Sequence, residues 1–281
     1  MGNIKSIADF ITELQNIPKP RGNELYFRGH SDFEYKLAPS IYRNSKLISN
    51  EHNLFKEFIL RTPTDFLNEK SALEKLVKMQ HYGLPTRLLD LTTNALVSLY
   101  FACDGNDKKD GEVIIFKIPK SDIKYYDSDT VSIISNISKR PADFSIETIK
   151  SLGKDIFNKQ DEIQYLLHEI REEKSYFQPL IIATDIERTV AVKVKQNNNR
   201  IIKQSGAFII FGIDNKKVNH AEIPDKWVQN NKTGISKTIE FLIDKDKKKE
   251  IMDELNTLGI NEASLFPELD NQAKYLKKKY G

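Results

Sequence analysis

The chain has 281 residues, of which 39% are hydrophobic and 30% are charged. Fifteen phenylalanines and eleven tyrosines supply bulky core material, so the composition excludes general disorder. With 43 basic and 40 acidic residues, the net charge of +3 neither requires nor excludes a nucleic-acid partner. The length is sufficient for one large domain or two modest ones.

The single cysteine, Cys103, excludes both an internal disulfide and a cysteine-rich zinc site. It ends the apolar run LVSLYFAC, where we expect a buried and unreactive thiol. No apolar run reaches transmembrane length, and nothing resembles a secretory signal. We therefore expect a cytoplasmic protein that uses no metal and contacts no membrane.

The N-terminal Met-Gly-Asn-Ile-Lys-Ser fits the myristoylation pattern through Gly2 and Ser6. The chain is rich in Lys, Asn and Ile, which is typical of bacteria, where this modification is not expected. Ser6 also suits the N-cap of a helix over residues 6–15. We favour the cap, and the pattern alone does not determine whether Gly2 carries a lipid.

Apolar periodicity predicts most of the elements in the first half of the chain. Helices are predicted at 6–15, after Asn50 as far as Thr62-Pro63, at 71–81, and from 93 or 94 to before Gly105. The last of these is apolar on nearly every side, which is typical of a helix in the middle of a domain. Strands are predicted at 24–28, 86–89 and 112–118.

The second half is less regular. From 120 to about 174 the chain is polar and helical in pattern, with Asp161 as a candidate helix cap. Strand patterns return at 180–183, 190–194, 207–211 and 239–243. A further helix directs Ile251, Leu255 and Leu258 inward and stops at Gly259, and residues 271–279 form a short basic helix or a frayed end.

The strand patterns needed to complete one sheet lie on both sides of residues 120–174. We therefore predict a single α+β domain whose core comprises 24–119 and 180–277, with a helical insertion at about 120–174.

A cluster of polar residues stands directly before the apolar helix. It comprises His81, Tyr82, Thr86, Arg87 and Asp90. Each buried polar group costs roughly 1–3 kcal/mol when it is unpaired, so such a cluster is either fully networked or binds a ligand. Arg87 and Asp90 could instead form a structural salt bridge, whose loss would unfold the protein.

Two motifs in the first half closely resemble the FRG-domain family, which is named for its first tripeptide. They are Phe27-Arg28-Gly29-His30 and HYGLPTRLLDLTTNALVSLYFA at 81–102. RIIKQSGAF at 200–208 and LFPELDNQAKYL at 265–276 are also similar to that family. The resemblance is close over about 24–119 and loose over 180–277, and family membership alone defines no chemistry.

The chain is more distantly similar to ADP-ribosyltransferases, whose first strand often ends Tyr-Arg-Gly and whose Arg contacts the phosphates of NAD. Leu25-Tyr26-Phe27-Arg28-Gly29 resembles that strand, and Thr86–Asp90, the helix through Phe101-Ala102 and Gly111–Ile118 follow in the same order. The resemblance implies a split mixed sheet flanked by helices, with NAD as the substrate.

The same resemblance implies roles for individual residues. Arg28 would anchor the pyrophosphate, and Tyr82 and Thr86 would line the nicotinamide site. The other residues implied to contact NAD are Gly29, His30, His81 and Arg87.

The chain departs from the transferases in two places. Arg87 stands where their hydroxyl-bearing strand has small residues. Their late Glu hydrogen-bonds the nicotinamide ribose, whereas the late motif here reads Gln204-Ser205-Gly206-Ala207-Phe208. Gln204, Asp90 and Glu240 are the candidates for that catalytic role.

Each candidate also has a structural alternative. Arg28 could pair with Asp90 or Asp32, and His30 could be a hydrogen-bonded core or turn histidine. His81 suits a helix C-terminus for electrostatic reasons. Further structural readings are turn formation by Gln204 and helix capping by Glu268 and Asp270.

The resemblance implies an ADP-ribosyltransferase-like enzyme that uses NAD to modify a protein or nucleic-acid acceptor. Such an activity would suit a bacterial toxin or phage-defence effector, and an inhibitory partner protein would suit that role. The alternative is a non-catalytic module that binds a nucleotide or nucleic acid, which the missing late Glu favours. A third hypothesis is an interaction protein that uses the helices of 120–174. The sequence identifies neither the acceptor nor the oligomeric state.

Overall fold

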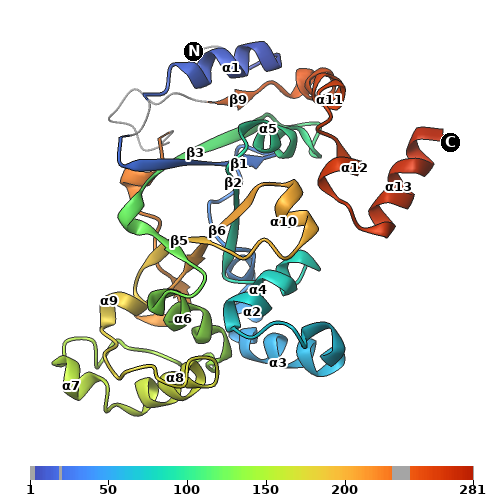
Figure 1. Ribbon diagram of the computed structural model, residues 1–281. Coiled ribbons are helices and arrows are strands. Elements are labelled where there is room, and N and C mark those ends of the chain that lie inside the picture. Colours follow the sequence, from blue (N-terminus) through green and yellow to red (C-terminus); the bar gives the residue numbers. More distant parts are fainter. Residues whose placement is uncertain (1–3, 19–20, 230–240, 281) are drawn as a thin grey trace.

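A seven-stranded mixed sheet, ordered β4-β5-β6-β2-β1-β3-β9, organises the computed structural model, which describes residues 4–18, 21–229 and 241–280 (Figure 1). Its strands are β1 (Asn23–His30), β2 (Leu88–Thr92), β3 (Gly111–Pro119), β4 (Ile123–Tyr125), β5 (Thr189–Lys193), β6 (Gly206–Phe211) and β9 (Leu242–Ile243). β4 pairs parallel to β5, and the other neighbours are antiparallel. β7 (Ile213–Asp214) and β8 (Lys216–His220) form a separate hairpin. The predicted α+β class is confirmed.

Helices surround this sheet. They are α1 (Ile7–Gln15), α2 (Ser45–Ser49), α3 (Glu51–Arg61), α4 (Ala72–His81), α5 (Ala95–Cys103), α6 (Asp129–Asn136), α7 (Lys154–Phe157), α8 (Asp161–Arg171), α9 (Ala183–Ile186), α10 (Asn199–Lys203), α11 (Lys248–Thr257), α12 (Glu262–Leu265) and α13 (Leu269–Tyr280). α1, α5 and α11 lie at the β1-β3-β9 end, whereas α4 and α6 lie at the other end (Figure 1). None of the helices among the described residues combines the length and apolar character that crossing a membrane requires.

The sheet divides between β1 and β2, which share one register pair, Phe27 with Thr92. Beyond it the two strands part, each within its own half-sheet. Tyr26 of β1 and Leu89 of β2 turn into a common core with Trp227, whereas Phe27 packs toward α5 on the opposite face. The division therefore leaves a gap between two central strands, and Tyr26, Leu89 and Trp227 pack together on one face of the sheet.

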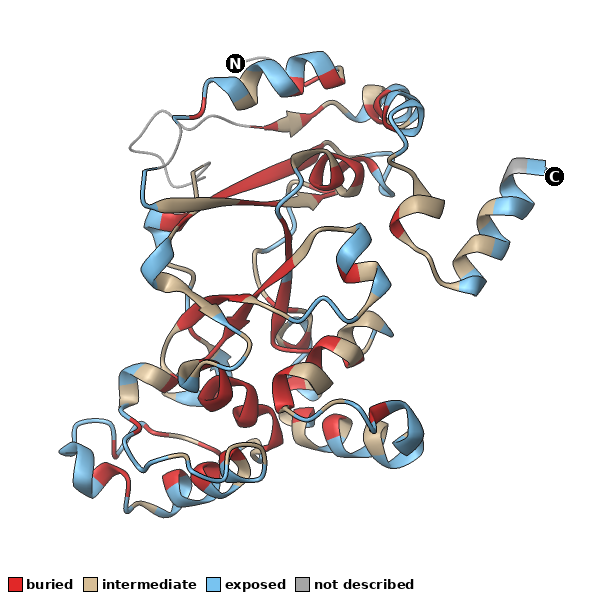
Figure 2. Ribbon diagram, in the orientation of Figure 1, coloured by how far each residue is buried: buried red, intermediate tan, exposed pale blue. Residues whose placement is uncertain are grey.

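α5 lies in the middle of the molecule, as its all-round apolar sequence predicts, and Figure 2 shows it largely buried. The side chain of Asn94 caps it by accepting from the Leu96 amide at 3.0 Å. Cys103 at its end is buried, and burial raises the pKa of that thiol to about 12. The prediction that this thiol is buried is therefore confirmed.

Two glycines let α5 lie directly on the sheet. A Cβ on Gly29 would stand 2.0 Å from the Ser98 carbonyl oxygen, and one on Gly111 would stand 2.1 Å from that of Ala102. Gly29 is also one of the residues implied to contact NAD. On its α5 side, the space that a side chain would need is filled by helix backbone.

Several predicted elements are confirmed, including α1 with Ser6 as its cap and α4 with a Ser71–Glu74 capping box. Gly259 ends α11 with a φ of +80°, as predicted. Leu258, predicted to point inward, is instead 58% exposed.

The predicted strand at 180–183 is wrong. The Asn158 side chain accepts from the Ile181 amide at 3.1 Å and donates to its carbonyl at 2.8 Å, so side-chain bonds replace a strand partner. Residues from Ala183 then form α9. Asp161 lies in the first turn of α8 and not at its cap, which is Gln160.

The segment 120–174 is not wholly helical, because β4 lies within it and joins the edge of the sheet. Of the predicted strand at 239–243, residues 239 and 240 lie outside the described residues, and β9 covers 242–243.

Replacing Gly29 by Ala should destabilise the protein by at least about 3 kcal/mol, because helix backbone cannot yield as a side chain would. Urea denaturation measures the change. Gly153→Ala is the matched control, since no atom lies within 4 Å of its added Cβ and its φ is −57°, and it should change stability by less than about 0.5 kcal/mol. Equal stability of the two variants would contradict the assigned role of Gly29.

Candidate functional site

A hollow of about 330 Å³ opens where β1 and β2 part. Its charged lining residues are Arg28, Arg43, Asp90, Asp104 and Arg200, and its aromatic ones are Phe27, Tyr35 and Phe101. A smaller hollow of about 50 Å³ adjoins it, since both are lined by Gln80, Asp90, Leu91, Arg200 and Gln204. We call the two together the strand-gap site.

Arg28 bridges the parted strands. Its Nη1 donates to the main-chain carbonyl of Asp90 at 2.7 Å, and its Nε donates to Nε2 of His30 at 2.9 Å. Its side chain is 16% exposed. Burial lowers the pKa of Arg28, the nearby carboxylate of Asp90 acts against this, and Arg43 adds to it. Within the described part of the chain Nη2 has no hydrogen-bond partner, so one arm of the guanidinium can contact a ligand.

His30 orients Arg28. Because its Nε2 accepts a hydrogen bond from Arg28, that nitrogen carries no proton, and the imidazole is neutral. The ring is buried and stands edge-on to Tyr35, with centroids 5.9 Å apart. His30 is therefore a buried acceptor at the wall of the site.

Asp90 is the exposed residue of an otherwise buried strand. Its neighbours along β2 are buried, whereas its own side chain is 62% exposed. One carboxylate oxygen, Oδ2, accepts from Gln80 Nε2 at 2.7 Å and lies 3.9 Å from Arg28 Nη1. The pair is open to the hollow and is not sealed within the core.

The end of α10 supplies the opposite wall. Gln204, the C-cap of α10, donates through Nε2 to the Leu265 carbonyl at 3.1 Å. The Arg200 guanidinium stacks 4.7 Å from the centroid of the Phe266 ring and donates to the His81 carbonyl at 3.3 Å. The segment between α12 and α13 therefore supports two lining residues from behind.

His81 lines only the smaller hollow, and its Nε2 lies 3.3 Å from Glu268. Burial lowers the pKa of His81, with Arg200 and Lys78 acting in the same direction and Glu268 acting against them. The neutral form of the ring is therefore favoured, which weakens the ionic character of this contact. Tyr82 is 62% exposed and lines a separate hollow.

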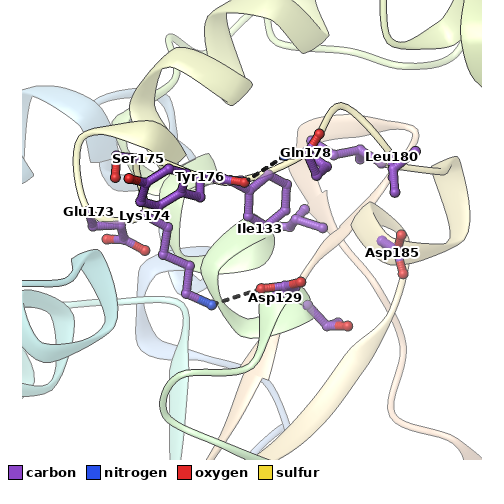
Figure 3. A pocket seen from close by; sticks show the side chains of 12 residues that line it. Asp129, Ile133, Glu173, Lys174, Ser175, Tyr176, Gln178, Leu180 and Asp185 are labelled. Carbon is purple, nitrogen blue, oxygen red and sulfur yellow. Dashed lines mark hydrogen bonds and ion pairs between the residues drawn. The ribbon is translucent and has the colours of Figure 1, made fainter.

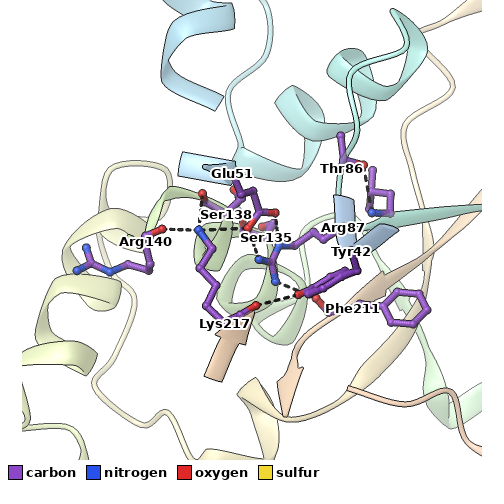
Figure 4. Close-up of polar contacts among 10 residues, drawn as sticks. Tyr42, Glu51, Thr86, Arg87, Ser135, Ser138, Arg140, Phe211 and Lys217 are labelled. Atoms are coloured by element: carbon purple, nitrogen blue, oxygen red, sulfur yellow. Dashed lines mark hydrogen bonds and ion pairs between the residues drawn. The ribbon is translucent and has the colours of Figure 1, made fainter. Parts of the chain in front are cut away.

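Thr86 and Arg87 are both buried, and neither lines the strand-gap site. Arg87 donates through Nε to Glu51 at 2.9 Å and through Nη1 to the Phe211 carbonyl at 3.0 Å (Figure 4). The suggested salt bridge between Arg87 and Asp90 is wrong. Residues three apart along an extended chain point to opposite faces, so these two side chains diverge.

The cluster around Arg87 is a buried ionic network. Lys217 lies 3.2 Å from Glu51 and donates to the carbonyls of Ser138 and Arg140 (Figure 4). Burial acts to raise the pKa of Glu51, but Arg87 and Lys217 together hold it below its usual value. This network connects α3, the start of β2 and β8, so its role in the fold is structural.

A wider hollow of about 680 Å³ lies apart from the strand-gap site, between α6 and the segment after α8 (Figure 3). Lys174 closes one side through a 2.9 Å ion pair with Asp129. Tyr176 beside it is 91% exposed. Of the residues predicted to bind NAD or to catalyse, none that the structure describes lines this hollow.

Of the predicted catalytic and NAD-binding residues, the structure brings six to the strand-gap site. They are Arg28, Gly29, His30, His81, Asp90 and Gln204, of which His81 lines only the smaller hollow. Glu240 lies outside the described residues. Among the described residues no group of three His, Cys, Asp or Glu is arranged as metal ligands would be.

Sequence reasoning missed Gln80, Arg43 and Arg200 as lining residues. Gln80 is adjacent to the predicted cluster, and Arg200 begins the RIIKQSGAF motif, so both carried a local signal. Arg43 is fifteen positions beyond Arg28 in an irregular segment, and only the fold brings it to the hollow.

Two of the strands that border the site, β1 and β2, lie in a segment that matches the model of a known domain family. Residues 23–111 match the model of the FRG domain family. No curated protein and no solved structure matches the chain. The match covers β1 and β2, and so includes Arg28, Gln80 and Asp90, but it assigns them no activity.

The buried network generates a prediction about pH. Burial lowers the pKa of Lys217 to about 8, against 10.5 for a free lysine, with Glu51 opposing this and Arg87 reinforcing it. When the pH lies between about 8 and 10.5, Lys217 binds a proton more fully in the unfolded chain than in the folded one. The free energy of unfolding therefore rises with pH in this range. The stability difference between wild type and Lys217→Met should therefore shift in favour of wild type by about 1–2 kcal/mol from pH 8 to pH 9.5.

Urea denaturation of both proteins at each pH measures this shift. Titration of Tyr42, the nearest tyrosine, falls above the window, because burial raises its pKa to about 12. Parallel pH curves for the two proteins would show that Lys217 stays charged throughout.

Proposed function

We propose that this member of the FRG family is an ADP-ribosyltransferase-like enzyme that binds NAD in the strand-gap site. One observation carries the proposal: a guanidinium from β1 and an exposed carboxylate from β2 face the same hollow, 3.9 Å apart. Phosphate recognition and stabilisation of a sugar cation require these two groups side by side.

The charge of the hollow supports binding of a pyrophosphate. Arg28, Arg43 and Arg200 line it together with Asp90 and Asp104. Burial and the nearby Glu262 raise the pKa of Asp104. The free arm of Arg28 is a planar donor that suits phosphate oxygens.

Aromatic surfaces in the same hollow support binding of a flat base. Phe27, Tyr35 and Phe101 all contribute to its lining. Stacking on aromatic faces contributes affinity without depending on a particular base.

Asp90 would act on the ribose. When the bond between ribose C1′ and the pyridinium nitrogen breaks, its electron pair leaves with neutral nicotinamide, and C1′ becomes an oxocarbenium-like cation. The Asp90 carboxylate stabilises that positive charge. A nucleophilic oxygen or nitrogen of the acceptor then bonds to C1′ and releases its proton to solvent. Water in the same position would yield free ADP-ribose.

The acceptor would be a protein or a nucleic acid, approached through the open side of the hollow. Such an activity would suit a cytoplasmic toxin or phage-defence effector, which an inhibitory partner protein would restrain. This biological setting is an analogy from the chemistry.

A non-catalytic nucleotide-binding module is the second candidate. The Gln204 side chain favours it, because it is uncharged where the transferases have Glu, and its amide is engaged by Leu265. This candidate predicts the same binding without turnover.

The catalytic claim is tested with labelled NAD, cell extract and a nicotinamide assay. Wild type should transfer label or release nicotinamide. Asp90→Asn should reduce turnover by about 100-fold or more, because it removes charge stabilisation of the transition state, while calorimetry still detects NAD binding. Asp253→Asn, at an exposed position on α11, is the matched control and should retain full turnover.

A wild type that binds NAD but releases no nicotinamide would establish the binding module instead. A wild type that does neither would exclude both candidates.

Arg28→Lys tests the phosphate contact, since it keeps the charge but loses the fork of donors. The dissociation constant for NAD should rise about tenfold or more, as expected when one charge-assisted hydrogen bond is lost. Arg61→Lys, an exposed substitution on α3, should leave calorimetric binding unchanged. Unaltered binding by the Arg28 variant would place the phosphates elsewhere.

A further inference from the structure

We infer that Gln80 is a positioning residue that holds the Asp90 carboxylate in its reactive orientation, with Thr86 fixing Gln80 in turn. The inference rests on the proposed function, because it assigns Asp90 its place at the ribose. It gives Gln80 and Thr86 roles in the site, although of these two only Gln80 lines the hollow.

The hydrogen bonds form a single chain from main chain to carboxylate. The Leu88 amide donates to Thr86 Oγ1 at 3.1 Å, and the Thr86 hydroxyl donates to Gln80 Oε1. Gln80 Nε2 then donates to Asp90 Oδ2 at 2.7 Å. Every donor in the chain therefore has an acceptor.

Chemistry fixes the direction of this chain. An ionised carboxylate can only accept, so the amide nitrogen of Gln80 must face Asp90. The amide oxygen then faces Thr86, whose hydroxyl must donate to it because an amide oxygen can only accept. The Thr86 oxygen also accepts from the Leu88 amide. Only this amide orientation satisfies every group.

This series of hydrogen bonds matters because the Asp90 side chain is exposed. A carboxylate that is 62% accessible would otherwise sample several rotamers, and its ordering would have to occur during the reaction. The contacts within the described residues all involve Oδ2, which Gln80 and Arg28 both approach. Among the described residues Oδ1 has no hydrogen-bond or ion-pair partner, so it can contact a ligand.

Gln80 is itself held by a rigid support. It lies in the last turn of α4, whose first turn is fixed by the Ser71–Glu74 capping box. Met79 beside it is fully buried. A helix end anchored in the core can define the position of an exposed group on the neighbouring strand.

The turn between α4 and β2 brings Thr86 back to Gln80. Gly83 takes a φ of +81°, its amide donates to the Gln80 carbonyl at 2.9 Å, and Leu84 donates to Met79 at 3.0 Å. Pro85 then directs the chain into β2. The turn formed by the HYGLPT sequence therefore places the buried Thr86 hydroxyl against the side chain of Gln80.

A purely structural tie between α4 and β2 would affect stability but would not separate kcat from KM. The test therefore compares Gln80→Leu, Thr86→Val and Thr86→Ser with wild type, measuring nicotinamide release over a range of NAD concentrations together with the melting temperature. Gln164→Leu on α8 is the matched control, because it removes a glutamine hydrogen bond far along the chain from the site.

Gln80→Leu should reduce kcat by about tenfold or more while KM for NAD changes by less than about threefold, because a misoriented carboxylate affects the transition state more than binding. Thr86→Val should reduce kcat in the same direction. Thr86→Ser, which keeps the hydroxyl, should restore kcat to within about twofold of wild type. Gln164→Leu should leave both constants unchanged.

An active wild type whose kcat is indifferent to Gln80→Leu would overturn the inference and leave the proposed function standing. So would a Gln80→Leu variant that raises only KM, since Gln80 would then bind substrate directly. A folded wild type that releases no nicotinamide defeats the proposed function, and the inference falls with it.

Discussion

The candidate site depends on one side chain that spans a discontinuity in the sheet. β1 and β2 share a single register pair, and beyond it their main chains no longer bond to each other. Arg28 replaces that ladder by donating to the Asp90 carbonyl, and His30 fixes its guanidinium from within β1. Without this hydrogen bond, the missing strand pairing would not be replaced at this point of the gap. With it, the gap is an opening lined by a cation and a carboxylate, which is the arrangement on which the proposed chemistry rests.

Arg87, directly before β2, and Asp90, in the middle of β2, are charged residues in contrasting environments. The Arg87 side chain is fully buried and donates hydrogen bonds to Glu51 and to the Phe211 carbonyl. Its charge therefore serves to hold α3, the start of β2 and the end of β6 together. Within the strand, Asp90 remains open to solvent and is held through one oxygen. A buried pair of the first kind is costly to break and offers nothing to a ligand. Sequence alone shows two charged residues three positions apart, and only the alternation of the strand separates their roles.

The features that the sequence predicted correctly depend on interactions between residues that are close in sequence. Caps, turns and apolar periodicity act over a few residues, so α1, α4, α5 and the strands around Phe27 and Phe116 were predictable. The strand expected at 180–183 failed because its hydrogen bonds go to Asn158, whose position no local pattern reveals. Arg87 was misassigned for the same reason, since Glu51 lies 36 positions away. Arg28 and Asp90 were identified because their motifs are local, whereas Arg43 reaches the hollow through the fold alone.

The close seating of α5 on Gly29 and Gly111 has a consequence for how the protein accommodates whatever it binds. Backbone against backbone leaves no side chains to rearrange, so the floor beneath the gap behaves as a fixed template. Adaptation to the size of a guest must then occur at the periphery, where Tyr35 and Arg43 lie in an irregular segment and Arg200 lies on a five-residue helix. Selectivity for shape would be set by the rim, while the reacting groups stay in place.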